Sequence, residues 1–372
     1  MAPPVVLFET RDAANGKKIG FATLNAERSL NALSFEMAQL LWERLHAWKD
    51  DPHIVCVVLQ GAGDKAFCAG GDIVALYKFL LQGDDPAARA GIERYFVREY
   101  ALDYLIHTFP KPVVCWGHGI AMGGGLGLMV GASHRVVTEK SRLAMPEIAI
   151  GLYPDVGASR FLRRMPGRVG LYVGLTGAPL NAADALFLKL ADHYVSSGDN
   201  AELFAQLPQL DWTESDRDNR RALSELFERY RDRHALAASN VRRHLDLINE
   251  VTDYSRVDDV AAAIAQRAGD DPWLARNAAA LQNGSPTSAK VIFEIYRRAA
   301  QLSLEQAFAL ELGLTIQFTR RPDLREGIRA LLIDKDNRPR WSPPTLAQVS
   351  DELVAQHFVS PWPPRRHPFN DW

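Results

Sequence analysis

Hydrophobic positions in the first half of the chain follow strand and helix periods in turn. Val5–Thr10 and Lys18–Leu24 are short runs rich in β-branched and aromatic residues, which predicts two strands. The Asn15-Gly16 pair between them is a strong signal for a tight turn, because both residue types tolerate a positive φ. The sequence therefore predicts a β-hairpin near the start of the chain.

A helix and a buried strand come next. Ser34 is a good helix N-cap, and an apolar stripe follows it at helical spacing: Ala38, Leu41, Leu45 and Trp48. Ile54–Leu59 is almost uninterrupted apolar sequence, the pattern of a parallel strand that is covered on both faces. Strand and helix patterns alternate to about Val195, which predicts an α/β fold with a layered core.

The pattern changes near residue 199. From Asp199 to about Ile333 the chain has long helical segments rich in Ala, Leu, Arg and Glu, and a Pro/Trp-rich tail follows. A chain of 372 residues is long enough for a large core or for about two domains. We predict an α/β core over residues 1–198, a helical region over residues 199–342 and a tail over residues 343–372.

Composition excludes some classes of protein. The formal net charge is −2 and hydrophobic residues make up 47% of the chain, which is typical of a globular protein without a general attraction for nucleic acid or anionic membranes. Cys56, Cys68 and Cys115 lack the spacing of a metal site or a disulfide framework, which predicts buried thiols. The N-terminal sequence has neither signal-peptide nor transit-peptide character, so we expect a cytoplasmic protein.

The most informative segment lies between Lys111 and Arg135, where 23 residues carry no formal charge and seven of them are glycine. A strand at Val113–Trp116 leads to a Gly-Gly-Gly turn that opens an apolar helix. The N–H groups at such a helix start can bind an oxyanion or a phosphate. The alternative is a membrane span with GxxxG steps, but glycine disfavours one long helix. We favour the strand, the turn and a short buried helix.

A second glycine turn, Ala69–Asp72, precedes a helix that we expect to begin near Ile73. The stretch before it, Gly61–Ala66, fits the dinucleotide pattern GxGxxA, but that pattern needs a helix at its end and Phe67–Gly71 interrupts one. NAD binding is therefore disfavoured. Two glycine turns that each follow a buried strand could instead place two N–H donors on one oxygen.

Three acidic residues are candidates for catalysis or substrate binding. Glu99 lies on an apolar helical stripe that includes Ile92 and Ile106, where a carboxylate is costly unless it is paired or used. It could form a buried ion pair with an arginine, or line a pocket and accept a substrate hydroxyl. Glu147 and Asp155 follow the Gly-Gly-Gly turn closely. The alternatives are a first-turn acid for Glu147 and a helix N-cap for Asp155.

Long stretches of this sequence resemble the crotonase (enoyl-CoA hydratase/isomerase) superfamily, and within it the 3-hydroxyisobutyryl-CoA hydrolase branch. The resemblance rests on AFCAGGDI (66–73), HGIAMGGGLGL (118–128) and AMPEIAIGLYPDVGASRFL (144–162). The superfamily pattern covers roughly residues 5–195. The branch pattern continues through SPTSAK (285–290) and REGIRALLIDKDNRPRW (325–341), so nearly the whole chain is covered.

The resemblance implies a spiral of ββα units with a helical C-terminal region. It implies an oxyanion hole made by the N–H groups of Gly71 and Gly124, with Arg28 and Ala69 beside the coenzyme A moiety. Coenzyme A would then be part of an acyl-CoA substrate, with no separate cofactor and no metal. A homo-oligomer would fit the family, without nucleic acid or a membrane as partner.

The same resemblance implies that Glu147 and Asp155 are catalytic and that Glu99 binds substrate. Hydratases of the superfamily carry a glutamate where this chain has Gly127, and usually a glycine where it has Asp155. The exchange implies thioester hydrolysis, specifically of 3-hydroxyisobutyryl-CoA in valine breakdown. Glu147 would either attack the carbonyl or activate water, and Asp155 would orient or transfer the proton.

Two other functions stay open from the sequence. One is enoyl-CoA hydration or isomerisation on the same fold. The other belongs to a different class, a non-catalytic scaffold that binds coenzyme A or RNA. The acids and the glycine turns disfavour a scaffold, and the lack of a concentrated basic patch disfavours RNA.

Overall fold

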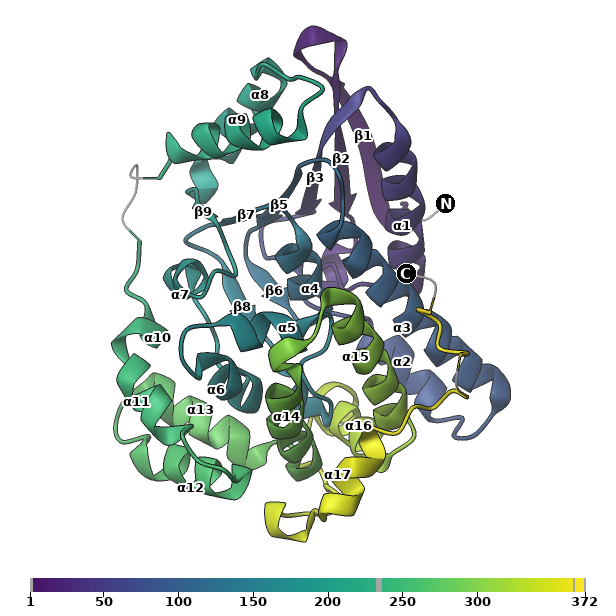
Figure 1. Ribbon diagram of the computed structural model, residues 1–372, viewed down its shortest axis with the longest axis vertical. Coiled ribbons are helices and arrows are strands. Elements are labelled where there is room, and N and C mark those ends of the chain that lie inside the picture. Colours follow the sequence, from purple (N-terminus) through teal and green to yellow (C-terminus); the bar gives the residue numbers. More distant parts are fainter. Residues whose placement is uncertain (1–2, 232–235, 364, 371–372) are drawn as a thin grey trace. The chain divides into compact units, whose positions relative to one another are not determined.

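The protein is described by a computed structural model over residues 3–231, 236–363 and 365–370 (Figure 1). The chain divides into two compact units. The first consists of Met1–Gly71, Ala101–Leu143 and Pro179–Arg242, and the second of Asp72–Tyr100, Ala144–Ala178 and Arg243–Trp372. These units do not follow the boundaries expected at residues 198 and 342. A compact unit defined by contacts is not the same as a domain, so the domain boundaries at residues 198 and 342 stay predictions.

A six-stranded sheet forms the centre of the first unit, in the order β1-β2-β3-β5-β7-β9. The first pair is antiparallel and every other pair is parallel, so the predicted hairpin and the predicted buried parallel strand are confirmed. Asn15 and Gly16 turn the hairpin with φ of 61° and 69°. The strands are β1 (Val6–Asp12), β2 (Lys18–Leu24), β3 (Ile54–Gly61), β5 (Val113–Gly117), β7 (His134–Val137) and β9 (His193–Tyr194).

A second, three-stranded sheet has the order β4-β6-β8, with β4 at Ala66–Cys68, β6 at Ile120–Met122 and β8 at Arg142–Ala144. From β3 to β8, successive pairs of strands therefore send one strand to each sheet before a helix follows, as the predicted ββα spiral requires. Ala66 begins a strand and not a helix, which removes the structural basis for a dinucleotide site at Gly61–Ala66.

Helix α1 (Phe35–Asp50) begins as predicted. The Ser34 side chain accepts a hydrogen bond from the Met37 N–H, and the stripe from Ala38 to Trp48 is buried. Burial of a large apolar side chain contributes roughly 1.5–3 kcal/mol, so this stripe accounts for the attachment of α1 to its unit. The other helices of the first unit are α4 (Gly124–Gly131), α7 (Ala182–Phe187), α8 (Asn200–Gln206), α9 (Asp216–Glu228) and α10 (Asn240–Arg243).

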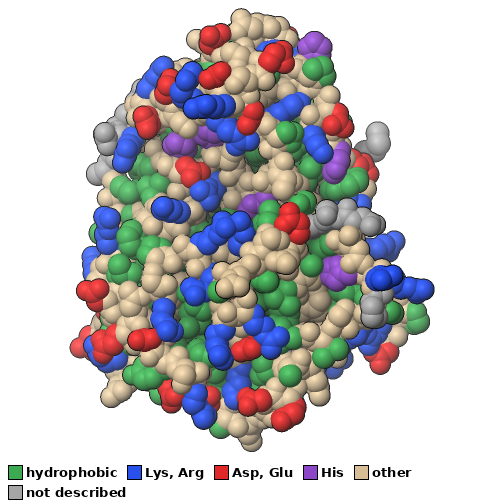
Figure 2. Space-filling view, viewed as in Figure 1, with side chains coloured by type: hydrophobic (Ala, Val, Ile, Leu, Met, Phe, Trp, Pro, Cys, Tyr) green, Lys and Arg blue, Asp and Glu red, His purple; other side chains and the backbone are tan. Residues whose placement is uncertain are grey.

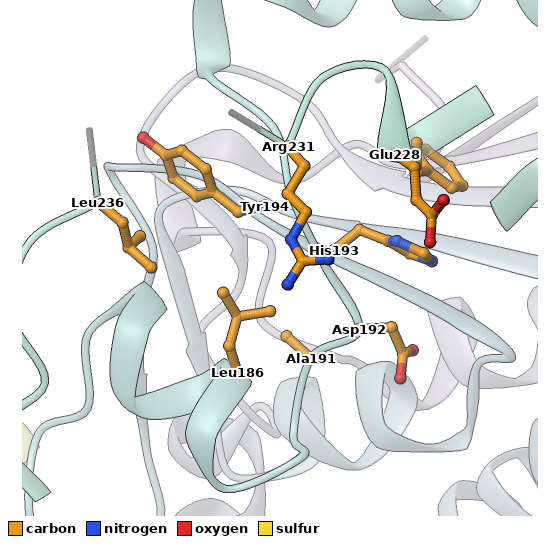
Figure 3. A pocket seen from close by; sticks show the side chains of 9 residues that line it. Leu186, Ala191, Asp192, His193, Tyr194, Glu228, Arg231 and Leu236 are labelled. Carbon is orange, nitrogen blue, oxygen red and sulfur yellow. The ribbon is translucent and has the colours of Figure 1, made fainter. Parts of the chain in front are cut away.

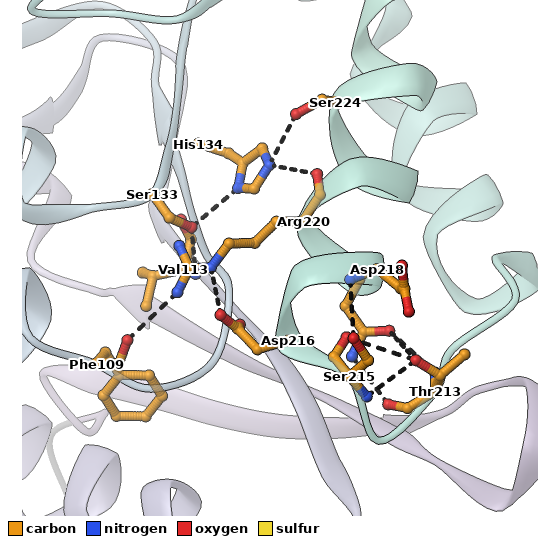
Figure 4. A network of polar contacts seen from close by, with 11 residues as sticks. Phe109, Val113, Ser133, His134, Thr213, Ser215, Asp216, Asp218, Arg220 and Ser224 are labelled. Atoms are coloured by element: carbon orange, nitrogen blue, oxygen red, sulfur yellow. Dashed lines mark hydrogen bonds and ion pairs between the residues drawn. The ribbon is translucent and has the colours of Figure 1, made fainter.

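Polar contacts connect α9 to the large sheet (Figure 4). His134 of β7 donates from Nε2 to the Arg220 carbonyl at 3.0 Å, and its Nδ1 lies 2.9 Å from the Ser133 hydroxyl. The Ser133 hydroxyl also lies 3.0 Å from the Val113 carbonyl, so its one proton is shared between this carbonyl and Nδ1 of His134. Burial lowers the pKa of His134, so a neutral ring makes these contacts.

The regular secondary structure of the second unit is almost entirely helical. Helix α3 (Pro86–His107) belongs to it as far as Tyr100 and then enters the first unit. The other helices of the second unit are α2 (Ile73–Leu80), α5 (Ala158–Phe161), α6 (Val169–Thr176), α11 (Leu245–Val251), α12 (Val257–Arg267), α13 (Pro272–Asn283), α14 (Pro286–Arg298), α15 (Leu304–Thr319), α16 (Pro322–Ile328) and α17 (Asp351–His357). After β9 the described chain is helical, as the sequence pattern predicts.

The uncharged segment forms β5, β6 and α4 and is not one long helix. Strand β6 was not predicted, because three residues between two glycine turns carry no periodic signal. In the described part of the chain no helix is long and apolar enough to cross a membrane. The three cysteines are free and buried, as expected.

Candidate active site

The two predicted oxyanion donors both lie in the first unit. Gly124 is the first residue of α4, where a helix leaves its N–H without an internal partner. Gly71 forms an isolated parallel bridge with Leu33, made by the Leu33 N–H to the Gly70 carbonyl at 2.7 Å. The Gly71 N–H has no hydrogen bond to another described residue. Both N–H groups are therefore available to an acceptor.

Close backbone packing brings the two glycine turns together. A Cβ on Gly70 would lie 3.9 Å from the Gly124 nitrogen, and a Cβ on Gly125 would lie only 2.1 Å from the Cys68 carbonyl oxygen. Gly123 has a φ of 49°, in the region that favours glycine. The glycines are needed for this approach, which gives the predicted convergence of the turns a physical reason.

The residues expected beside coenzyme A also lie close together in the first unit. Ala69 donates its N–H to the Leu30 carbonyl at 3.0 Å, and the exposed Arg28 lies two residues before Leu30. The structure thus joins the Arg28 loop to the turn that carries Gly71. Binding of coenzyme A by Arg28 and Ala69 stays a prediction.

The three predicted acids all lie in the second unit and are all buried, with exposed fractions of 3% for Glu99, 6% for Glu147 and 5% for Asp155. Burial raises the pKa of each, and the charge of Asp155 raises the pKa of Glu99 and of Glu147 further. Glu147 Oε2 has no hydrogen-bond partner among the described residues. An unpartnered buried carboxylate oxygen is costly, which is a mark of a functional group.

Glu99 lies on the buried face of α3, as its apolar stripe predicts. The alternative of an ion pair with an arginine is wrong for the described residues, because no Lys or Arg pairs with Glu99. A hydrogen bond from Tyr95 lowers its pKa but does not offset the effect of burial. The carboxyl is thus kept in the interior without a cation.

The sequence offered a structural alternative for each of two acids, a first-turn acid for Glu147 and a helix N-cap for Asp155. The first describes its residue in part, and the second does not. Glu147 lies in the first turn of the 3-10 helix η3 (Glu147–Ile150), as the first-turn alternative says, but its Oε2 remains unpartnered. The N-cap of α5 is Gly157 and not Asp155, and this N-cap residue has no side chain that could bond to the helix. The Asp155 carboxylate instead accepts a hydrogen bond of 2.6 Å from the Tyr100 hydroxyl.

Glu311 of α15 is a further buried acid, which the sequence reasoning missed. Its two carboxylate oxygens accept the N–H groups of Gly157 at 2.6 Å and Ser159 at 2.8 Å. Val156 and Gly157 have φ of 52° and 87°, so the turn after Asp155 needs external support. The argument applied to Glu99, a carboxylate on an apolar helix, would have identified Glu311 as well.

Glu311→Gln is expected to lower the unfolding free energy by roughly 1–3 kcal/mol, because an amide NH₂ cannot accept one of the two N–H groups. Burial raises the pKa of Glu311 to about 8 from the usual value of 4.5. Wild-type stability from this group is therefore complete below pH 4.5 and falls as the pH rises through 8, by at most about 1.4 kcal/mol per pH unit. The advantage of wild type over the variant should shrink between pH 5 and pH 8.

Denaturant unfolding of both proteins at the two pH values measures this difference. Glu305→Gln, an exposed change on the same helix, is the control and should alter stability little at either pH. An advantage of wild type that grows with pH would show that the pKa of Glu311 is lowered and not raised.

One large cavity lies apart from the predicted site residues. It has a volume of about 520 Å³ and is lined in the first unit by residues that include His193 and Tyr194 of β9, Glu228 of α9 and Arg231, which follows α9 (Figure 3). The His193 ring stacks on Phe227 with centroids 4.7 Å apart, and burial lowers its pKa to about 4. The ring is neutral at physiological pH, and none of the predicted catalytic residues lines this cavity.

Neither a metal cluster among the described residues nor a strong basic patch on the face shown in Figure 2 marks another site. The described residues contain no group of three or more His, Cys, Asp or Glu side chains that could hold a metal ion. On the face shown in Figure 2, Lys and Arg side chains are interspersed with Asp and Glu. The charge distribution on that face has no single-sign region of the kind that attracts nucleic acid.

The fold and these groups together match one family of acyl-CoA enzymes. The family described as enoyl-CoA hydratase/isomerase matches residues 19–358. The chain belongs to this family. Its sequence is 38% identical over 342 residues to "3-hydroxyisobutyryl-CoA hydrolase, mitochondrial" of Gallus gallus, with 91% of this chain and 86% of that protein covered. It is 34% identical over 344 residues to the Homo sapiens protein of that name, with coverages of 92% and 86%.

Solved structures agree on the fold. A carnitinyl-CoA dehydratase from Mycobacterium thermoresistibile matches with a TM-score of 0.85 and 34% identity, over 100% of both chains. An enoyl-CoA hydratase from Rhodobacter sphaeroides matches with a TM-score of 0.82 and 34% identity, over 96% of this chain and 97% of the other. The crotonase fold and the helical C-terminal region are thus confirmed.

Proposed function

We propose that the protein hydrolyses the thioester of a 3-hydroxyacyl-CoA, specifically 3-hydroxyisobutyryl-CoA, to 3-hydroxyisobutyrate and coenzyme A. The observation that carries the proposal is the group of buried acids Glu99, Glu147 and Asp155, none of which pairs with a Lys or Arg in the described part of the chain. Buried acids with raised pKa values are suited to hold and transfer protons near neutral pH. The names of the relatives that are 34–38% identical support the same reaction.

In this proposal backbone N–H groups supply the electrostatic part of catalysis. The N–H groups of Gly71 and Gly124 polarise the thioester carbonyl and stabilise the oxyanion that forms when the carbonyl carbon is attacked. Arg28 and Ala69 bind the coenzyme A part of the substrate. Coenzyme A leaves as a product, and the reaction needs no further cofactor.

The buried acids supply the nucleophile or base and the proton donor. Glu147 either attacks the carbonyl carbon to form an anhydride, which water then cleaves, or removes a proton from the attacking water. Asp155 orients the reacting group or gives its proton to the leaving thiolate. The unpartnered Oε2 of Glu147 suits both routes, because it is free to approach an electrophile or a water.

The second candidate is hydration or dehydration of the acyl chain, and the names of the two solved structures favour it. Gly127 disfavours it, because the hydratase pattern has a glutamate at that position. We therefore rank hydrolysis first. A role in valine catabolism, a cytoplasmic location and a homo-oligomer belong to the same proposal. The word mitochondrial in the names of the animal relatives describes those proteins.

Glu99→Gln is expected to reduce the preference of the enzyme for a 3-hydroxylated substrate. A carboxylate that accepts the 3-hydroxyl would be left unpaired by a substrate without that hydroxyl, so wild type should strongly favour 3-hydroxyisobutyryl-CoA over isobutyryl-CoA. The variant should lose more activity on the first substrate than on the second. Release of free thiol measures kcat/KM for both substrates and both proteins.

The two substrates serve as internal controls for each other. A purely structural role of Glu99 predicts equal losses on both and a lower Tm. An unchanged ratio of the two kcat/KM values would remove Glu99 from the substrate site, and no thiol release from either substrate by wild type would end the proposed hydrolysis.

A further inference from the structure

A chain of three hydroxyl groups runs through the second unit from Asp155 to the backbone of α15. The Tyr100 hydroxyl lies 2.6 Å from Asp155 Oδ2 and 2.7 Å from the Thr315 hydroxyl. The Thr315 hydroxyl lies 2.9 Å from that of Tyr153, which donates to the Glu311 carbonyl at 2.7 Å. All of these groups are buried, so water does not compete for the contacts.

The protons in this chain can be counted. Four oxygen–oxygen contacts link the carboxylate at one end to the carbonyl at the other, and three hydroxyls supply three protons. Both ends only accept when Asp155 is ionised. One of the four contacts then has no proton, and two oxygens face each other at hydrogen-bond distance without a bond.

A protonated Asp155 completes the chain. Asp155 then donates a hydrogen bond to Tyr100, Tyr100 donates to Thr315, Thr315 donates to Tyr153, and Tyr153 donates to the Glu311 carbonyl. Every contact then holds one proton, and the bonds point in one direction, which strengthens each of them.

We propose that Thr315 is a positioning residue that keeps the proton on Asp155. Of the two catalytic acids, Glu147 and Asp155, it is then Asp155 that donates a proton. The role in catalysis rests on the proposed hydrolysis. As the carbon–sulfur bond breaks, the Asp155 proton passes to the leaving thiolate sulfur and gives free coenzyme A thiol. The water that supplies hydroxide to the acyl carbon gives up its other proton. Glu147 removes that proton first in the general-base route, and in both routes it returns to Asp155 by the end of turnover, so the chain is complete again.

The titratable groups around Asp155 include no described cation that would favour its ionised form. The titratable groups that interact with it are Glu99 and Tyr100 on α3, Glu147 on η3, Tyr153 on its own loop and Glu311 on α15. No described Lys or Arg acts on its pKa, which burial raises to about 6. Proton retention by Asp155 is therefore not opposed by a neighbouring cation.

Three substitutions separate this role from a general packing role. Thr315→Val removes the middle hydroxyl, so the Tyr100 and Tyr153 protons fill the two remaining contacts when Asp155 is ionised. The pKa of Asp155 should fall by roughly half a unit to one unit, the equivalent of one hydrogen bond. Tyr153→Phe should lower it for the same reason. Tyr100→Phe removes the donor to the carboxylate and should raise it.

The measurement is a pH titration of the free protein by NMR, with ¹³C in the aspartate side-chain carboxyl carbons and the Asp155 signal identified by its absence in Asp155→Asn. Thr315→Ser keeps the hydroxyl and should titrate like wild type. A pKa that rises or stays unchanged in Thr315→Val, or in Tyr153→Phe if only that variant folds, would overturn the proposal. The two variants are independent, so failure of one to fold leaves the test intact.

The NMR titration needs no substrate, so its result does not depend on whether the proposed hydrolysis is correct. If the protein hydrolyses the thioester, kcat of Thr315→Val should decline at a pH lower than wild type by the same half to one unit. If wild type releases no thiol, the hydrolase proposal fails while the NMR shifts still decide the role of Thr315. A lower Tm with an unmoved titration would indicate packing alone.

Discussion

Glu147→Gln is expected to lower kcat for thioester hydrolysis by ~10²–10⁴, the usual contribution of a general acid, base or nucleophile. The amide has the shape of the carboxyl, but it neither attacks a carbonyl carbon nor accepts a proton from water. Glu147 Oε2 has no partner among the described residues, so no hydrogen bond at that atom is lost. The unfolding free energy should therefore change little, and binding of coenzyme A should be retained.

Two measurements separate chemistry from damage to the fold in this variant. Thermal unfolding and calorimetric binding of coenzyme A test the structure, and thiol release tests turnover. Glu36→Gln, an exposed acid in the first turn of α1, is a matched control for loss of one carboxylate and should leave kcat unchanged. Near wild-type turnover in Glu147→Gln would exclude Glu147 as nucleophile or base.

Gly124→Pro is expected to reduce kcat by ~10²–10³, because it removes one of the two proposed oxyanion donors. Gly124 is the first residue of α4, a position at which helices tolerate proline, since the N–H has no partner inside the helix. The loss should therefore concern catalysis more than folding. Rates of thiol release and the Tm are measured together.

Gly124→Ala is the control, because it keeps the N–H and changes only the side chain. The proline variant should be much less active than the alanine variant at a similar Tm. If Gly124→Pro folds and hydrolyses the thioester as fast as Gly124→Ala, the N–H of Gly124 is not an oxyanion donor.

Local signals account for the parts of the structure that were predicted. The cap at Ser34, the continuous apolar run at Ile54–Leu59 and the glycines of the two turns each act within a few residues, so their meaning can be read from the chain. Glu99 was found by the same local reasoning, since a carboxylate interrupts an apolar stripe. Glu99 is buried and has no described Lys or Arg partner, so its carboxyl does lie on the apolar face of the helix, as that reasoning predicts.

Long-range contacts account for what was missed. Thr315 lies 215 residues from Tyr100 and 162 from Tyr153, and no local pattern relates a helix near the end of the chain to a tyrosine in α3. Asp155 looked like an N-cap because it follows a proline and precedes a short helix. Its carboxylate bonds to Tyr100 instead, because Gly157 and Glu311 shape the turn that follows.

The most direct test of the central claim is to identify the products formed from 3-hydroxyisobutyryl-CoA by wild-type protein. Hydrolysis cleaves the carbon–sulfur bond and gives free coenzyme A and 3-hydroxyisobutyrate in equal amounts, whereas dehydration removes water and leaves the thioester intact. Mass spectrometry of the reaction mixture distinguishes the two. We predict equal amounts of coenzyme A and 3-hydroxyisobutyrate, with no unsaturated acyl-CoA. An unsaturated acyl-CoA without free coenzyme A would contradict the proposed function.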